Sequence, residues 1–230
     1  MSGKIAIPVI YEDNHVLVAE KPPNLLTQGD STGDEDMLTL LREDLKLRFN
    51  KPGNVYLGLV HRLDRPVGGA MVFAKTSKAA SRLSEQIRLG EFGKSYLAVI
   101  HGVPGQTSGT LVNNLIKDEA TNTVRVTSNT GEGKAASLEY SVRDSRNGLS
   151  LVHIKLHTGR SHQIRVQFAA IGHPLYGDQK YGAALNRPGM QLALWSVEVG
   201  FRHPTLQKYE TFTSTPPKVN PWNIFHTVEK

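Results

Sequence analysis

Short apolar runs separated by turn residues fill the middle of the chain, and they restrict the possible folds strongly. The runs lie between Gly109 and Thr158, with turn-rich stretches such as Asn129–Gly133 between them. Strands that follow one another at this spacing, with no helix between them, favour antiparallel pairing. The four predicted strands are Thr110–Ile116, Thr123–Thr127, Ala136–Val142 and Leu149–Leu156.

Three helices are predicted around this strand-rich region. Ser77–Leu89 has apolar residues at helical spacing, and Gly90 is its stop. Asp34 is predicted to cap a helix before it, and Ser161 one that runs through Ala170. The remaining predicted strands are Val16–Ala19, Tyr56–Val60, Ala70–Ala74, Tyr96–Ile100, Leu192–Val199 and Tyr209–Thr213.

The order of these elements predicts the fold class. Helices and strands mix without regular βαβ alternation, and no internal repeat or linker divides the sequence. We therefore expect one α+β domain over residues 1–230, a mainly antiparallel mixed sheet flanked by helices and loops. A chain of 230 residues is long enough to bury a substantial core.

Composition excludes several classes of protein. The chain has no cysteine, which removes disulfides, thiolate metal sites and cysteine nucleophiles and fits a reducing cytoplasm. No apolar run approaches the ~18 residues of a transmembrane helix. The net charge of +6 fits a polyanionic partner such as nucleic acid, although charge alone leaves an ordinary basic protein equally open.

The run His61-Arg62-Leu63-Asp64-Arg65 is the first candidate site. It lies between two apolar runs, where a scaffold can hold a reactive loop firmly. Two flanking arginines favour an ionised Asp64, and an ionised carboxylate can be a base, a metal ligand or a nucleophile. A loop that is merely held by its own ion pairs is the alternative.

The run Thr158–Arg165 is the second candidate site. A tight turn leads into a predicted helix whose first turn carries Arg160 and Arg165, and this arrangement suits an anion such as phosphate. Arg165 can point into a site while Ile164 and Phe168 pack on the adjoining face. An ordinary capped surface helix is the alternative.

Both runs belong to a longer set of motifs that resembles the RluA-type RNA pseudouridine synthases. His61–Asp64 is followed by Gly68-Gly69 and Val72–Thr76, as in that family's signature. Further matches are Lys94–Val99, Thr158–Val166, Ile171–Asp178 with Tyr181-Gly182, and the opening Tyr11–Pro22. The matches stand in the family's order and span the chain from about Ile10 to Pro217.

The resemblance implies an isomerase that detaches uracil from its ribose nitrogen linkage, turns it and rejoins it through carbon. It implies that Asp64 is the nucleophile, that Arg62 helps flip out the uridine, and that Tyr96 stacks on the base. It implies also that Arg165 pairs with Asp64. These residue types suit the roles, because a carboxylate is ionised at neutral pH, an aromatic ring stacks on bases, and a guanidinium matches a carboxylate bidentately. For Tyr96 alone, a core tyrosine remains the alternative.

Three further expectations follow from the resemblance. Arg160 is a candidate for substrate binding, and Ile164 or Leu194 for an apolar contact with the base. The sequence leaves open whether Asp64 attacks the uracil ring or the ribose. Neither route needs a metal or another cofactor. The partner is expected to be structured transfer or ribosomal RNA, bound by a cytoplasmic monomer that needs no protein partner.

Two departures from the family's pattern leave the choice of RNA open. Pro66-Val67-Gly68-Gly69 stands where the family more often has a polar residue, threonine, serine and glycine, and the missing hydroxyls can change a contact to RNA. The chain is also expected to begin directly at the catalytic domain, without the small RNA-binding domain of several relatives. RNA recognition would then depend on the catalytic domain itself.

Rival functions fit the sequence less well. A basic RNA-binding module would not require a carboxylate at position 64. A metal-dependent hydrolase lacks a His-Glu-x-x-His run, and a zinc base deaminase needs cysteine ligands. Gly131–Lys134 is too short for a phosphate-binding loop and is predicted to be a hairpin turn.

Overall fold

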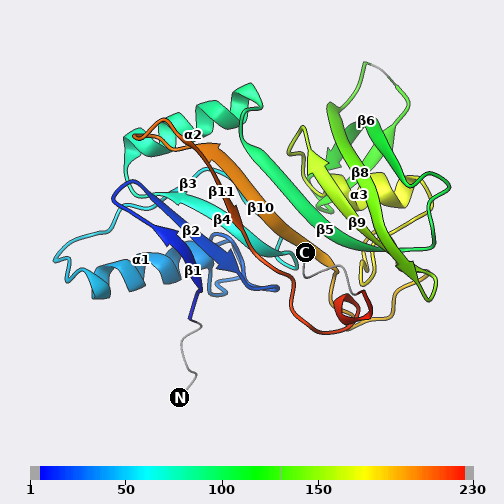
Figure 1. Ribbon diagram of the computed structural model, residues 1–230, viewed down its shortest axis with the longest axis horizontal. Helices are drawn as coiled ribbons and strands as arrows, with labels where there is room; N and C mark the ends of the chain where they lie inside the picture. The colour runs from blue at the N-terminus through cyan, green and yellow to red at the C-terminus, as the bar shows by residue number, and fades with distance from the viewer. Residues whose placement is uncertain (1–5, 130, 226–230) are drawn as a thin grey trace. The chain divides into compact units, whose positions relative to one another are not determined.

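The computed structural model describes residues 6–129 and 131–225, which pack as two compact units (Figure 1). Of the described residues, unit 1 comprises 6–93 and 196–214, and unit 2 comprises 94–129, 131–195 and 215–225. Both contain helices and antiparallel strands, so the predicted α+β class is confirmed.

Unit 1 is built on an antiparallel arrangement of strands. β2 (Val16–Lys21) pairs with β1 (Val9–Glu12) on one side and with β4 (Gly68–Ala74) on the other. β3 (Gly58–Leu59) also pairs with β4, and β10 (Leu194–Arg202) pairs with β11 (Tyr209–Thr213). The helices are α1 (Met37–Arg48) and α2 (Ser77–Leu89).

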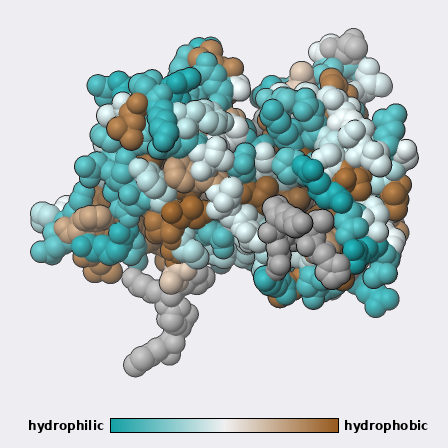
Figure 2. Space-filling view, viewed as in Figure 1, coloured by the Kyte–Doolittle hydropathy of each residue, from teal (hydrophilic) through white to brown (hydrophobic). Residues whose placement is uncertain are grey.

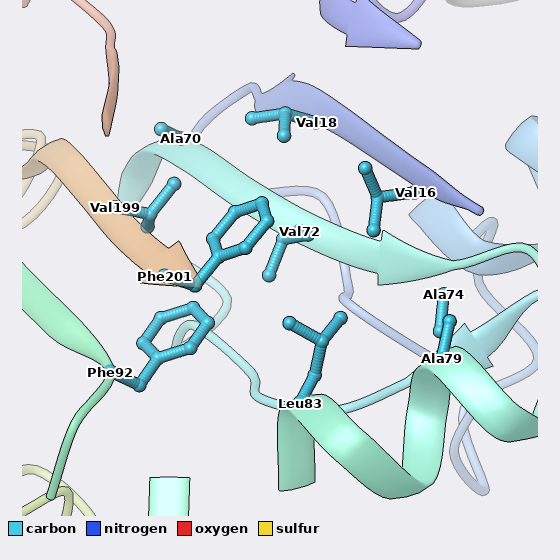
Figure 3. Packing of buried hydrophobic residues seen from close by; sticks show 10 residues of the cluster. All are labelled: Val16, Val18, Ala70, Val72, Ala74, Ala79, Leu83, Phe92, Val199 and Phe201. Atoms are coloured by element: carbon cyan, nitrogen blue, oxygen red, sulfur yellow. The ribbon is translucent and has the colours of Figure 1, made fainter. Parts of the chain in front are cut away.

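The core of unit 1 lies between α2 and these strands (Figure 3). Leu83 points from α2 toward Val72 of β4, and the rings of Phe92 and Phe201 stack with centroids 5.7 Å apart. β4 is buried along its whole length. Because β4 follows the His61–Arg65 run directly, that run is attached to the most buried strand of the unit.

Unit 2 contains the strand-rich middle of the chain. β5 (Gly93–His101) pairs with β9 (Leu149–Leu156), which pairs with β8 (Lys134–Arg146). β6 (Ser108–Asp118) lies between β8 and β7 (Thr123–Thr127). The unit also holds α3 (Gln163–Ala170) and the 3-10 turn η1 (Trp222–Ile224).

α3 covers one face of the strands of unit 2. The register places Tyr96 of β5 beside Ile154 of β9, and Ile154 beside Tyr140 of β8. Residues paired in this way point to the same face of a sheet. The ring of Tyr140 packs edge-on against Phe168 of α3 at 5.5 Å, so Tyr96 faces the side on which α3 lies.

Several local predictions are wrong. Asp36, and not Asp34, caps α1 by accepting from the Thr39 backbone N–H, while Asp34 pairs with Arg65 at 2.7 Å. Ser161 does not cap α3, since the residue before the helix is His162 in a left-handed conformation. Gly131–Lys134 is not a hairpin turn between neighbouring strands, because β6 pairs with both β7 and β8.

The predicted strand Tyr56–Val60 shrinks to the two residues of β3. By contrast, α2, β7, β9 and β11 have the predicted bounds. In the described part of the chain no helix is long and apolar enough to cross a membrane. On the face shown in Figure 2, hydrophobic side chains are interspersed among hydrophilic ones.

Candidate active site

The loop that carries Asp64 is fixed to unit 1 at several points. Leu63 and Val67 are buried on either side of Asp64. The Thr27 hydroxyl donates to the Leu63 carbonyl at 2.8 Å, and the Val67 N–H donates to the Asp64 carbonyl at 3.0 Å. Downstream, the Val72 N–H donates to His61 Nε2 at 3.0 Å. The backbone on both sides of the carboxylate is therefore held in one conformation.

A fully buried lysine supports this loop. Lys21 Nζ donates to the carbonyls of Pro22, Arg65 and Val67 at 3.0, 2.9 and 2.8 Å. Three acceptors match the three donors of an ammonium group and favour its charged form. Burial lowers the pKa of Lys21 to about 7; the Asp64 carboxylate opposes this shift, and the Arg65 charge adds to it. Lys21 thus brings a positive charge into the electrostatic surroundings of Asp64.

Close backbone packing explains a glycine in the strand after the loop. Gly69 has φ +115°, and a Cβ at this position would lie 2.3 Å from the Ser196 carbonyl oxygen. A side chain would therefore push β4 away from β10. The fold therefore requires Gly69, the last residue of the Pro66–Gly69 run.

The two arginines of the loop differ in their surroundings. Arg65 bonds to Asp34 and donates through Nε to the Asn24 carbonyl at 3.2 Å. Arg62 is exposed, and within residues 6–129 and 131–225 its guanidinium has no ion-pair or hydrogen-bond partner. Arg62 is therefore available to a ligand, whereas Arg65 mainly ties the loop to its neighbours.

Unit 2 holds the other residues predicted from the sequence. Tyr96 is 6% exposed on β5, Ile164 and Leu194 are buried, and Arg160 is exposed in the turn before α3. Arg160 Nε donates to the Ala135 carbonyl at 2.9 Å. The structure thus brings Arg62 and Asp64 together in unit 1, and Tyr96, Arg160, Ile164 and Arg165 together in unit 2.

Arg165 forms a buried ion pair that the sequence analysis did not identify. Its Nε and one terminal nitrogen bond the two carboxylate oxygens of Asp178 at 2.8 and 2.9 Å, and both side chains are almost fully buried. The guanidinium also lies over the ring of Tyr181, 5.1 Å from its centroid. The Tyr181 hydroxyl accepts from the Val124 N–H at 2.8 Å. Side-on pairing and ring stacking fix the plane in which Arg165 lies.

Lys21 and Asp178 lie within the motifs Tyr11–Pro22 and Ile171–Asp178, but the sequence analysis assigned no role to either residue. A lysine before Pro22 and an aspartate after Gly177 have no periodicity that marks them as buried. The available signal was their charge inside otherwise apolar or turn-like runs, where a buried ion needs a partner.

Comparisons with known proteins identify the family of the chain. The family model described as RNA pseudouridylate synthase matches residues 15–170, more than half of the chain. An "Uncharacterized RNA pseudouridine synthase" of Aquifex aeolicus (strain VF5) is 33% identical over 230 residues, covering 93% of this chain and 71% of that protein. A "Ribosomal large subunit pseudouridine synthase D" of Xylella fastidiosa (strain Temecula1 / ATCC 700964) is 35% identical over 206 residues, covering 88% and 60%.

The fold is also that of a solved relative. The structure titled "Human RNA Pseudouridylate Synthase Domain Containing 4" matches with a TM-score of 0.76 at 21% identity, covering 92% of this chain and 89% of that one. The chain belongs to the RNA pseudouridylate synthase family, whose members are isomerases that act on RNA. It spans about 60% of the length of several curated relatives, the Xylella protein among them.

Proposed function

We propose that this chain isomerises specific uridines of ribosomal or transfer RNA to pseudouridine, with Asp64 as the nucleophile. The observation that carries the proposal is the family match over residues 15–170, a range that contains Asp64, Tyr96 and Arg165. The anchored loop adds support, because a nucleophile must be held in place while the base leaves and returns. Relatives named for the ribosomal large subunit make its RNA the first substrate to test.

In the proposed reaction Asp64 forms a covalent adduct with a uridine that has left its helix or loop. The bond from ribose to nitrogen breaks, the uracil turns, and a bond from ribose to carbon 5 forms while carbon 5 loses its hydrogen as a proton. The bond to Asp64 breaks as well, which regenerates the carboxylate and releases the pseudouridine. Arg62 helps to flip the nucleotide, since its exposed guanidinium can enter the vacated position. Tyr96 stacks on the uracil, and Ile164 or Leu194 supplies an apolar contact.

Arg165 is assigned to pairing with Asp64 in this proposal. Its Nε side is bonded to Asp178, so the guanidinium has a defined orientation before substrate arrives. The enzyme is proposed to act as a cytoplasmic monomer, a location that fits a cysteine-free chain. No step of this reaction requires a cofactor.

Release of tritium from ribosomal RNA labelled at carbon 5 of uridine tests the function. We expect release by the wild-type protein and a loss of at least about 10³-fold in Asp64→Asn, because an amide cannot replace a nucleophilic carboxylate. Asp44→Asn is the control, since Asp44 only pairs with Arg48 on the surface of α1. Full activity of Asp64→Asn would show that another group is the nucleophile.

Mapping of pseudouridines in RNA from cells that lack the protein identifies the target. A site lost from ribosomal RNA, transfer RNA or both names the substrate. If the wild-type protein binds RNA but neither assay detects isomerisation, the protein is a binding module on this fold.

A further inference from the structure

Lys94 is a half-buried lysine on the same side of β5 as Tyr96. Alternate residues of a strand point to one face, so Lys94 and Tyr96 share the face on which α3 lies. Their Cα atoms are separated by about 6.6 Å along the strand. The Lys94 ammonium reaches the exposed turn before α3, where a Cβ added to Gly159 would lie 3.0 Å from Nζ. Lys94 therefore brings a charge to the surface next to the tyrosine assigned to base stacking.

The Lys94 side chain is partly desolvated, and no described residue compensates for this at its ammonium group. Among the described residues, Nζ makes neither a hydrogen bond nor an ion pair. Lys21 provides the contrast, since its ammonium donates to three carbonyl oxygens. Burial lowers the pKa of Lys94, which reflects the same lack of compensation. A nearby anion would compensate for this charge.

A second basic side chain lies in the same turn. Arg160 immediately follows Gly159 and is exposed. Only its Nε is engaged within the described part of the chain, by the Ala135 carbonyl, so the terminal nitrogens can donate to a ligand. Gly159 has no side chain that would separate an incoming group from Lys94. The turn thus presents two cations around an open backbone position.

We propose that Lys94 and Arg160 bind a backbone phosphate of the RNA strand that carries the target uridine, adjacent to the nucleotide whose base stacks on Tyr96. The inference rests on the proposed function, because it takes Tyr96 as the base-stacking residue. A phosphodiester fits this position because its charge compensates the Lys94 ammonium and its several oxygens accept from both side chains. The contact is independent of base identity, so it positions the strand and does not select the uridine.

The test measures binding of a fluorescein-labelled uridine decamer by anisotropy, in KCl from 50 to 200 mM. Lys94→Met keeps the length and apolar stem of the side chain, and we expect it to weaken binding about five- to tenfold at 50 mM KCl. The slope of log affinity against log salt should fall by about 0.7, the value for one phosphate contact to a single strand. Lys94→Arg should retain most of the wild-type affinity and most of the wild-type salt slope. A decamer with neutral methylphosphonate linkages should abolish the difference between wild type and Lys94→Met.

Lys155→Met is the matched control, because Lys155 lies on the neighbouring strand β9, is exposed, and points to the opposite face from Ile154. It should bind like wild type. Thermal unfolding checks that each variant is folded, and Lys94→Gln replaces Lys94→Met if the latter is not. The inference is overturned if Lys94→Met has the affinity and salt slope of wild type. It is also overturned if Lys155→Met loses as much affinity as Lys94→Met, or if wild type does not bind the decamer.

Tritium release by the same proteins separates this inference from the proposed function. If wild type releases tritium but Lys94→Met binds the decamer normally, only the phosphate site is wrong. If binding depends on Lys94 but wild type releases no tritium from any RNA, the phosphate site stands without the isomerase. For an active enzyme we expect Lys94→Met to raise KM more than it lowers kcat, because a phosphate contact is made in the bound ground state as well.

Discussion

At the scale of single residues, the site depends on charges that are buried and compensated inside each unit. Asp178 illustrates this, because it accepts from Arg165 and also from the backbone N–H groups of Lys180 and Tyr181 at 3.0 and 3.1 Å. One carboxylate therefore shapes the turn after Gly177 and orients the guanidinium. Its two functions explain why it is fully buried in a segment that otherwise consists of turns.

Asp178→Asn should reduce both stability and activity. An amide keeps one acceptor oxygen but removes the negative charge beside a buried guanidinium, which costs about 3 kcal/mol in comparable buried pairs. We expect that loss in urea unfolding, together with a reduced kcat in the tritium assay. Asp144→Asn is the control, since Asp144 pairs with Arg146 near the surface and should change stability by less than about 1 kcal/mol. Equal effects of the two substitutions would contradict this role of Asp178.

At the scale of elements, local sequence signals predicted some boundaries and missed others for identifiable reasons. α2 has the predicted bounds because Thr76 caps it and Gly90, with φ +75°, ends it, and both signals are local. α1 begins two residues later than Asp34 suggests. Asp34 and Asp36 are the same residue type, and tertiary contacts distinguish them: Asp34 pairs with Arg65, whereas Asp36 forms an isolated bridge with Leu26. α3 begins at a left-handed His162, for which the sequence has no signal.

The turn between β1 and β2 is held by a network that also makes stability pH-dependent. Asp13 accepts from the His15 and Val16 N–H groups, both at 2.7 Å, and pairs with the buried His203 at 2.9 Å. Burial alone would raise the pKa of Asp13, but the Val16 and His15 donors and the His203 charge outweigh it and lower the pKa. Asp13 thus connects the β1–β2 turn to the β10–β11 turn, a contact that the sequence did not indicate.

Asp13→Asn should lower stability at neutral pH and remove part of the acid sensitivity. Because the folded pKa lies below the ordinary 3.8, this carboxylate stabilises the fold above that pH, and its contribution is lost as the pH falls through the folded value. We expect a loss of about 1–2 kcal/mol at pH 7 and a smaller decrease between pH 4 and pH 3 than in wild type. Urea unfolding at each pH measures both. If the stability of Asp13→Asn falls between pH 4 and pH 3 as steeply as that of wild type, other carboxylates cause the acid sensitivity.

At the scale of the whole molecule, the candidate site residues could be proposed from sequence motifs, but the contacts that hold them could not. Asp64, Tyr96 and Arg165 stand in motifs with a fixed order along the chain. The partners that hold or complete them are distant in sequence: Lys21 bonds to the Arg65 and Val67 carbonyls, and Lys94 reaches Gly159. Such contacts depend on strand register and loop packing, which composition and periodicity do not determine.

The net positive charge of the chain favours RNA binding, whereas the negative charge of Asp64 opposes it. One binding experiment can separate the two contributions to RNA affinity. A net charge of +6 implies that RNA binding weakens as salt rises, with a slope set by the number of phosphates contacted. Asp64 contributes to chemistry in our proposal and opposes the phosphate backbone electrostatically. Asp64→Asn should therefore bind ribosomal RNA as tightly as wild type, or up to about threefold more tightly, with the same salt slope.

Filter binding of ribosomal RNA in KCl from 50 to 200 mM measures both quantities for the two proteins. Retained binding together with lost tritium release would place the function of Asp64 in the reaction and not in RNA recognition. If Asp64→Asn instead loses affinity in proportion to its loss of activity, the carboxylate contributes mainly to holding the RNA or the loop. In that case the anchoring network around Lys21, and not nucleophilic attack, would be the reason for an aspartate at position 64.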